Sequence, residues 1–228
     1  KLLMVNPVTA AEIEIKQRSK ADPLDSDEIA RVLEAAVSPL FRTMLKLWFC
    51  TGLRRGELLG LKYGDLDLVR GEVAISRTFS RCTLGTPKTD GATRVVSFQH
   101  PVCDPAGGWE PDPEDRELVE ALGALRRDPE AFLWHSHRPF PEDMLGRFWK
   151  ATLTRAGVRY RTPEQARHSF ASTMLSRGAP LLYVQQQGGW ADAVTVLRHY
   201  SKWMPRTRPT AVTQPTATPA QPTLRVVK

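Results

Sequence analysis

Regularly placed glycines divide the C-terminal half of the chain into short segments of helical periodicity. Glycine adopts the left-handed backbone conformation that ends a helix more easily than other residues do. Stops at Gly157, Gly178 and the pair Gly188-Gly189 therefore separate predicted helices. We predict helices at residues 141–156, 163–177, 180–187 and 192–200.

The N-terminal half predicts further helices. Asp25 and Glu28 have the spacing of an N-terminal capping pair, and apolar residues recur after them at helical spacing. Residues 40–50 are nearly all apolar and lead to Gly52, where we expect the second helix to end. Residues 55–61 restart as a short third helix.

Between Gly71 and Phe98 the apolar residues no longer recur at helical spacing. They fall in short runs of β-branched residues broken by glycine and proline, which predicts a small antiparallel sheet. Residues 101–113 are rich in proline and glycine and predict a loop, and leucines at 118, 122 and 125 predict one more amphipathic helix. The predicted fold class is α+β, mainly α-helical with a small antiparallel β-sheet.

Composition points to a polyanionic partner. The chain has 228 residues, 41% of them hydrophobic, which is enough for one sizeable core. A net charge of +7 and a pI of about 9.6 make nucleic acid the main candidate. Cysteines at 50, 82 and 103 have neither disulfide nor zinc spacing, and the His-x-His pair at 135 and 137 has no third ligand, so we predict a reducing compartment and no metal site.

Two basic residues stand where they can reach a phosphate. Arg54 comes after a glycine that ends one predicted helix, and Arg54 itself starts the next one. Its guanidinium can therefore clamp two phosphate oxygens while the carboxylate of Glu57 holds the guanidinium in place. The alternative is an ordinary surface Arg–Glu pair. Lys88 follows Pro87 at the tip of a predicted hairpin, where its ammonium can reach a leaving oxygen; the alternative is a solvated turn lysine.

Further candidates lie near the C-terminus. Arg167 and His168 are adjacent in a predicted helix whose buried side includes Phe170, so the His points away from the Arg and we expect a structural or supporting role for it. Trp190 can pack its ring on the core and offer its indole N–H to an anion. Tyr200 ends the last predicted helix.

This ordered set of motifs resembles the catalytic domain of the tyrosine recombinases, the phage-type integrase family. The motifs occur in the family order and at compatible spacings within residues 24–204. They are Thr51-Gly52-Leu53-Arg54 with Glu57 and Leu58, then Pro87-Lys88-Thr89, then Arg167-His168-Ser169-Phe170-Ala171, and finally Gly189-Trp190 followed by Tyr200.

The resemblance implies a role for each matching residue. Arg54 and Arg167 would hold the scissile phosphate, and Lys88 would act as general acid. Trp190 would occupy the position held by His or Trp in the family, and Tyr200 would be the nucleophile. The implied activity is site-specific cutting and rejoining of DNA through a 3′-phosphotyrosine, without metal, ATP or another cofactor, for integration or excision of a mobile element.

One position departs from the family pattern. The family most often has His three residues before the second Arg, whereas this chain has Glu164. We expect its carboxylate one helical turn before Arg167, near the phosphate and Tyr200, where it braces the guanidinium or accepts the phenol proton. We favour bracing, because a carboxylate flanked by two guanidiniums is a weak base.

The resemblance also implies partners and domains. We expect a tetramer on double-stranded attachment sites in the cytoplasm of a bacterium or phage-infected host, with accessory DNA-bending or directionality proteins and no membrane. Residues 1–23 would be a linker after a missing N-terminal DNA-binding domain, residues 24–204 the catalytic domain, and residues 205–228 a disordered basic tail rich in Pro and Thr. The alternatives are a type IB topoisomerase-like enzyme and a catalytically impaired DNA-binding relative.

Overall fold

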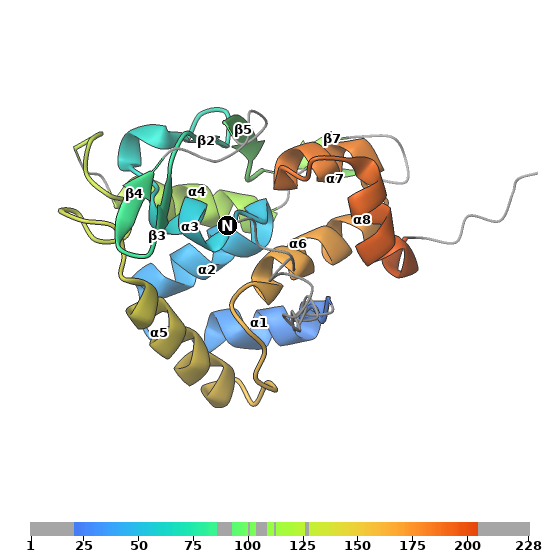
Figure 1. The fold of residues 1–228 in the computed structure, drawn as a ribbon, viewed down its shortest axis with the longest axis horizontal. Helices are drawn as coiled ribbons and strands as arrows, with labels where there is room; N and C mark the ends of the chain where they lie inside the picture. Colours follow the sequence, from blue (N-terminus) through green and yellow to red (C-terminus); the bar gives the residue numbers. More distant parts are fainter. Residues whose placement is uncertain are drawn as a thin grey trace, which may run out of the picture.

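The computed structural model describes residues 21–85, 93–99, 101–103, 109–111, 113–125 and 128–204. Over these residues the protein is mainly helical, with small antiparallel sheets (Figure 1). The predicted fold class is therefore confirmed.

The N-terminal helices form where the sequence predicts them, as α1 (Ser26–Glu34), α2 (Pro39–Thr51) and α3 (Arg55–Leu59). The predicted capping box is present at the start of α1. The Asp25 side chain accepts from the Glu28 N–H at 2.8 Å, and the Glu28 side chain accepts from the Asp25 N–H at 3.1 Å. Two unpaired backbone donors of the first turn are thereby satisfied.

The strands lie along one edge of the molecule (Figure 1). After a 3₁₀ turn, η2 (Tyr63–Asp65), the main sheet has the antiparallel order β1-β2-β5, with Val73 of β2 opposite Val96 of β5. A separate hairpin pairs β3 with β4. The bounds are β1 (Leu66–Asp67), β2 (Glu72–Ile75), β3 (Thr78–Ser80), β4 (Thr83–Gly85) and β5 (Arg94–Ser97).

The predicted loop at residues 101–113 was wrong in part. The structure has two short paired strands there, β6 (Pro101–Cys103) and β7 (Trp109–Pro111), with Val102 opposite Glu110. Proline argues against a central strand but is tolerated in short strands that are paired on one side only. A three-residue ladder therefore fits a stretch that looked too broken for regular structure.

The remaining helices form in the predicted segments. They are α4 (Pro113–Ala124), α5 (Glu142–Arg155), α6 (Gln165–Ser176), α7 (Leu181–Gly188) and α8 (Ala193–Tyr200). The ends of α5 to α8 differ from the predicted bounds by at most two residues. Beyond α8 the chain continues as a 3₁₀ turn, η4 (Ser201–Trp203), which the sequence did not predict.

Two hydrophobic clusters support these elements. The larger one surrounds α2, whose Trp48 is fully buried and meets the ring of Trp149 on α5 edge to face at 6.0 Å. The smaller one joins α6, α7 and α8 and includes Phe170 and Tyr200. Helix α6 packs against α2 and so links the two clusters. In the described part of the chain, the helices are too short or too polar to cross a membrane.

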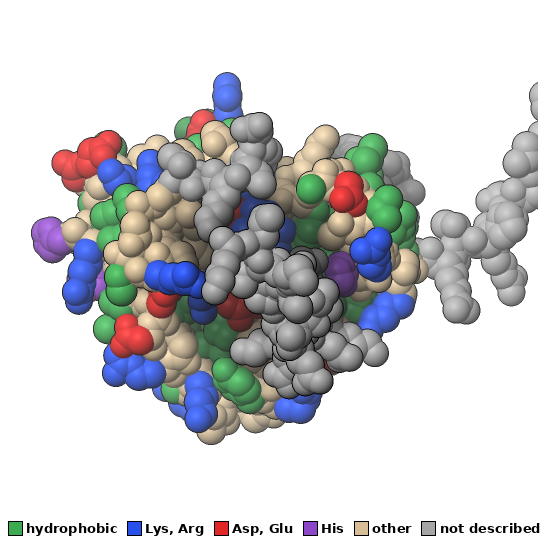
Figure 2. All heavy atoms as spheres, viewed as in Figure 1, with side chains coloured by type: hydrophobic (Ala, Val, Ile, Leu, Met, Phe, Trp, Pro, Cys, Tyr) green, Lys and Arg blue, Asp and Glu red, His purple; other side chains and the backbone are tan. Residues whose placement is uncertain are grey.

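Basic side chains are spread over the surface. On the face shown in Figure 2 they lie around the periphery, and a further group lies in the middle of the face, between α3 and α7. The described candidate site residues lie on or next to these two helices, α6 and α8.

Candidate active site

Arg54 is fixed by the turn between α2 and α3. Gly52 ends α2 with a φ of 61°, and a Cβ there would lie 2.2 Å from a ring carbon of Phe170, so the turn requires glycine. Glu57 then accepts from the Arg54 backbone N–H at 2.8 Å and from its Nη1 at 2.9 Å. Arg54 Nη2 donates to the carbonyl of Gly189 at 2.7 Å, and the side chain stays 45% exposed. The predicted Arg–Glu pair is present.

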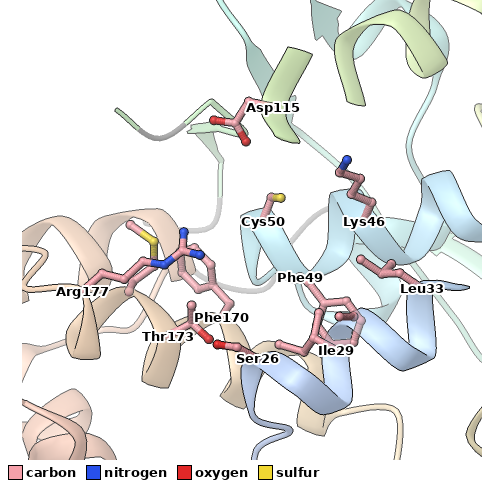
Figure 3. A pocket seen from close by; sticks show the side chains of 12 residues that line it. Ser26, Ile29, Leu33, Lys46, Phe49, Cys50, Asp115, Phe170, Thr173 and Arg177 are labelled. Atoms are coloured by element: carbon pink, nitrogen blue, oxygen red, sulfur yellow. The ribbon is translucent and has the colours of Figure 1, made fainter. Parts of the chain in front are cut away.

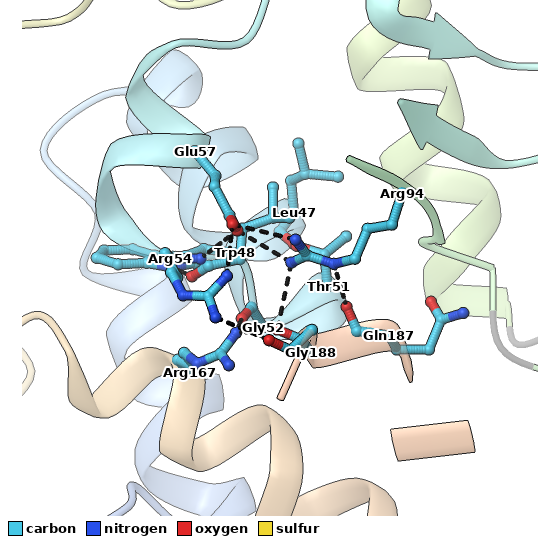
Figure 4. A network of polar contacts seen from close by, with 12 residues as sticks. Leu47, Trp48, Thr51, Gly52, Arg54, Glu57, Arg94, Arg167, Gln187 and Gly188 are labelled. Atoms are coloured by element: carbon cyan, nitrogen blue, oxygen red, sulfur yellow. Dashed lines mark hydrogen bonds and ion pairs between the residues drawn. The ribbon is translucent and has the colours of Figure 1, made fainter. Parts of the chain in front are cut away.

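Glu57 also binds a second arginine that sequence reasoning missed. Arg94, at the start of β5, donates from Nη1 and Nη2 to the two carboxylate oxygens of Glu57, both at 3.0 Å (Figure 4). Burial raises the pKa of Glu57, but the hydrogen bonds and charge of Arg94, together with Arg54, outweigh it and hold that pKa below its usual value. Glu57 is thus a buried carboxylate that orients two guanidiniums.

Arg94 extends this network to the end of α7. Its Nε donates to the carbonyl of Gln187 at 3.0 Å and its Nη2 to that of Gly188 at 3.3 Å (Figure 4). Carbonyls at a helix C-terminus carry partial negative charge and favour a cation. No local signal could reveal this role, because the partners of Arg94 lie far away in the sequence.

Arg167 approaches the same carbonyls from α6. Its Nη1 donates to the carbonyl of Gly52 at 2.8 Å and to that of Gly188, while its guanidinium stacks on the Trp190 ring at 3.9 Å. Burial and the charge of Arg54 lower the pKa of Arg167 to about 9, so it remains a cation at neutral pH. Within the described residues its hydrogen bonds use Nη1 alone, which leaves Nη2 and Nε for a ligand.

Trp190 owes its position to the glycine pair before it. Gly189 caps α7 with a φ of 66°, and a Cβ on Gly188 would lie 1.8 Å from the Trp190 ring. The ring therefore folds back over the end of α7. One side of it meets Arg167, and it also meets Tyr200 edge to face at 5.6 Å.

Tyr200 is fully buried at the end of α8. Asp192 caps this helix by accepting from the Thr195 N–H at 2.6 Å. Burial raises the pKa of the Tyr200 phenol to about 12, although the charge of Arg167 acts in the opposite direction. Its Oη lies 2.6 Å from Nδ1 of His168. A supporting role was predicted for His168, and the structure puts it in contact with the phenol.

One expected site residue lies apart from this cluster. Glu164 lies just before α6 with its side chain half exposed, and its carboxylate pairs with Arg55 at 3.3 Å. The expectation that it braces Arg167 is therefore wrong, because its carboxylate pairs with the partly exposed Arg55 at the start of α3. Lys88 lies outside the described residues.

The structure thus brings together Arg54, Glu57, Arg167, Trp190, Tyr200 and His168. Two guanidiniums converge on neighbouring carbonyls of one glycine pair, beside a phenol. Such a pair of cations can hold the oxygens of a phosphate.

A hollow elsewhere contains none of these site residues. It has a volume of about 160 Å³ and lies between α1, α2, α4 and α6 (Figure 3). Lys46, Cys50, Asp115, Phe170 and Arg177 are among the residues that line it.

Comparison with known proteins agrees with this geometry. The sequence profile of the phage integrase family matches residues 23–205. The chain belongs to this family. The expectation drawn from the motifs is therefore confirmed.

Relatives in the family are distant. The putative defective protein IntQ of Escherichia coli strain K12 is 28% identical over 205 residues, which cover 83% of this chain and 52% of that protein. A XerC-like tyrosine recombinase of Caldanaerobacter subterraneus subsp. tengcongensis is 27% identical over 92% of this chain and 59% of its own length. The chain thus spans between half and three fifths of these two relatives.

Solved structures of integrases have the same fold. The Tn1549 transposon integrase in complex with circular intermediate DNA superposes with a TM-score of 0.62 at 19% identity, covering 81% of this chain and 64% of that one. The predicted catalytic-domain fold is therefore confirmed.

Proposed function

We propose that this chain is the catalytic part of a site-specific DNA recombinase that cuts and rejoins DNA through a 3′-phosphotyrosine. One observation carries the proposal. Arg54, just before α3, and Arg167 of α6 donate to the neighbouring carbonyls of Gly189 and Gly188, and the charge of Arg167 acts on the phenol of Tyr200, within an integrase fold. The names of the relatives support this activity. The Tn1549 integrase is bound to circular intermediate DNA in its solved structure, which supports DNA as the substrate.

The proposed chemistry follows from these groups. Oη of Tyr200 gives its proton to a base and attacks the phosphorus, a P–O bond to the phenol oxygen forms, and the bond to the 5′ oxygen breaks. Negative charge grows on the nonbridging oxygens, where Arg54 and Arg167 stabilise it without reorganising. Lys88 gives a proton to the departing 5′ oxygen. The covalent bond conserves the phosphodiester energy, so a second 5′ hydroxyl can reverse the step.

Glu57 and Arg94 are proposed to position this machinery. The carboxylate of Glu57 joins Arg54 to Arg94, and Arg94 holds the carbonyls at the end of α7, next to Trp190. Trp190 in turn covers one face of the Arg167 guanidinium. The phosphate site is thereby preorganised across segments far apart in the sequence.

Partners beyond the substrate also belong to the proposal. We expect a tetramer on paired attachment sites in the cytoplasm, integrating or excising a mobile element, with accessory DNA-bending or directionality proteins. Family membership supports this assembly, because recombination joins two duplexes. Residues 24–204 would supply the chemistry, and residues 205–228 would contact a neighbouring subunit or DNA.

A covalent-capture experiment tests the proposal. The protein is incubated with labelled duplexes of random sequence that carry a nick shortly downstream of the cleavage position. The short fragment that carries the new 5′ hydroxyl then diffuses away after cleavage, which traps the adduct. Wild type should form adducts enriched in one sequence, and Tyr200→Phe should bind DNA but form none. Tyr160→Phe, which changes an exposed tyrosine, is the matched control and should behave as wild type.

Other outcomes separate the alternatives. Adducts without sequence enrichment, together with relaxation of a supercoiled plasmid by the monomer, would indicate a topoisomerase. DNA binding without any adduct would indicate a catalytically impaired relative. Adduct formation by Tyr200→Phe at the wild-type rate would refute the assigned nucleophile.

A further inference from the structure

The contact between His168 and Tyr200 joins two distant segments at a reacting atom. His168 lies on α6 and Tyr200 at the end of α8, 32 residues later, and their polar atoms are 2.6 Å apart. The rings lie at 5.6 Å with a tilt of 44°. This is a short, specific hydrogen bond within a largely apolar cluster, and such bonds are strengthened by the low local dielectric.

The direction of this bond follows from the protonation states. Burial raises the pKa of the phenol to about 12, so the phenol is protonated at neutral pH. Burial, with the charges of Arg167 and His199, lowers the pKa of His168 to about 4, so its imidazole is neutral. The phenol O–H can then donate to Nδ1 while Nε2 carries the imidazole hydrogen.

Other bases near the site are engaged elsewhere. The carboxylate of Glu164 pairs with Arg55, and that of Glu57 is held by two arginines. The rings of His199 and Tyr200 pack edge to face, with centroids 6.1 Å apart. Within the described residues, His168 is the side chain that hydrogen-bonds the phenol oxygen.

We propose that His168 is the general base that removes the phenolic proton of Tyr200 during cleavage and returns it during rejoining. The inference rests on the proposed function and deepens it. As the bond from Oη to phosphorus forms, the O–H bond breaks and its proton passes to Nδ1. The bond to the 5′ oxygen breaks, and that oxygen takes a proton from the general acid, for which Lys88 is proposed.

The charges around His168 suit this role once DNA is bound. Arg167 and Glu164 face it from its own helix region, and His199 and Tyr200 face it from α8. The cation of Arg167 opposes protonation of the imidazole in the free protein. A phosphate bound to Arg167 offsets that cation, so its arrival favours the imidazolium when the proton is transferred. The position at which the family most often has His holds Glu164 here, and its carboxylate pairs with Arg55.

The test measures single-turnover adduct formation on the nicked random-duplex library as a function of pH. His168→Asn keeps an acceptor near the Nδ1 position but cannot take a proton, and His199→Asn is the matched control. Wild type should show a rate that rises with pH and then levels off as His168 loses its proton. His168→Asn should lose about 100-fold or more at neutral pH and show no plateau, since general-base catalysis supplies rate factors of this size.

A second measurement separates a base from a mere hydrogen-bond partner. Each variant is also prepared with 3-fluorotyrosine, whose phenol is more acidic and needs less help. Fluorination should restore much of the rate of His168→Asn and change wild type and His199→Asn little. Circular dichroism and thermal melting verify that each variant is folded.

The outcomes are distinct. A His168→Asn variant with the wild-type rate and pH profile would overturn the inference, and so would a slow variant that keeps the wild-type profile and gains nothing from fluorination. Both results leave the proposed function intact, because wild type still forms adducts. An absence of adducts from folded wild-type protein would overturn the proposed function and this inference together.

Discussion

Arg167 is the residue at which the separate parts of the candidate site meet. It contacts the carbonyl that ends α2, the carbonyl that ends α7 and the ring of Trp190. Its guanidinium is therefore desolvated and oriented before any substrate arrives. A phosphate bound there would meet a preorganised cation, which is the condition under which electrostatic stabilisation is most effective.

Substitutions of Glu164 show whether the departure from the family pattern affects stability or adduct formation. Because the Glu164 carboxylate pairs with Arg55 at a half-exposed position, Glu164→Gln and Glu164→Ala should each change unfolding free energy by less than about 1 kcal/mol. Both should keep most adduct formation on nicked duplexes, and Arg55→Ala serves as the matched control for the lost ion pair. If Glu164→Gln were as inactive as Tyr200→Phe, Glu164 would be the proton acceptor and His168 would not.

The buried imidazole of His168 should make stability depend on pH. Its pKa is about 4 in the folded protein and 6.5 as the ordinary value, so the unfolded chain binds the proton first as pH falls. The neutral imidazole of His168 therefore contributes to the free energy of unfolding above pH 6.5, and this contribution is lost as pH falls toward 4. The loss should be about 2 kcal/mol after allowance for partial exposure. Urea unfolding of wild type between these pH values should show a steeper decline than that of His168→Asn. Equal declines would contradict the folded-state pKa of His168.

At the scale of elements, Arg94 couples the sheet to the site, and the Ser97 N–H of the same strand also donates to the side chain of Gln187 on α7. Arg94 at the start of β5 bonds both oxygens of Glu57 on α3 and the last carbonyls of α7. Three elements far apart in the sequence are thereby held in one arrangement.

Arg94→Lys should break this coupling while keeping the positive charge. An ammonium cannot reproduce the two parallel bonds of the guanidinium, and Glu57 would be left partly unpaired in a buried position. We expect a loss of about 3 kcal/mol in unfolding free energy, as for a disrupted buried ion pair, and slower adduct formation. Arg147→Lys, which changes an exposed pair with Asp143, should have almost no effect. Equal melting temperatures for the two variants would show that Arg94 does not join these elements.

The elements themselves were largely predictable from the sequence, and their contacts were not. Helix ends depend on local signals such as the Asp25–Glu28 capping box and the left-handed Gly52, which a sequence displays directly. The pairing of Arg94 with Glu57 and the pointing of Glu164 toward Arg55 depend on tertiary packing. Each motif fixes a short local geometry, so a contact within one motif, such as Arg54 with Glu57, was predictable. Contacts between distant motifs, such as His168 with Tyr200, were not.

At the scale of the whole molecule, basic charge is distributed over many elements. The net charge is +7, and basic groups lie on the periphery as well as at the candidate site (Figure 2). Such a field attracts a polyanion without specifying a sequence. Binding to DNA should therefore weaken as salt is raised, and cleavage chemistry should depend on the few groups of the site.

Salt titrations can separate these contributions. The slope of log K against log salt should change by about 0.9 for each phosphate contact removed, so Arg54→Ala should flatten it by that amount. Tyr200→Phe removes no charge and should leave the slope unchanged. Fluorescence anisotropy with a labelled duplex measures both. An unchanged slope for Arg54→Ala would contradict its proposed contact with phosphate.

The central claim is that Tyr200 becomes covalently joined to DNA, and peptide mapping tests it most directly. Adducts captured on nicked duplexes are digested with nuclease and protease, and tandem mass spectrometry identifies the residue that carries a nucleotide 3′-phosphate. Tyr200 should be the single modified residue. A phosphonucleotide on Tyr160 or Tyr183, or on a residue that is not tyrosine, would contradict it.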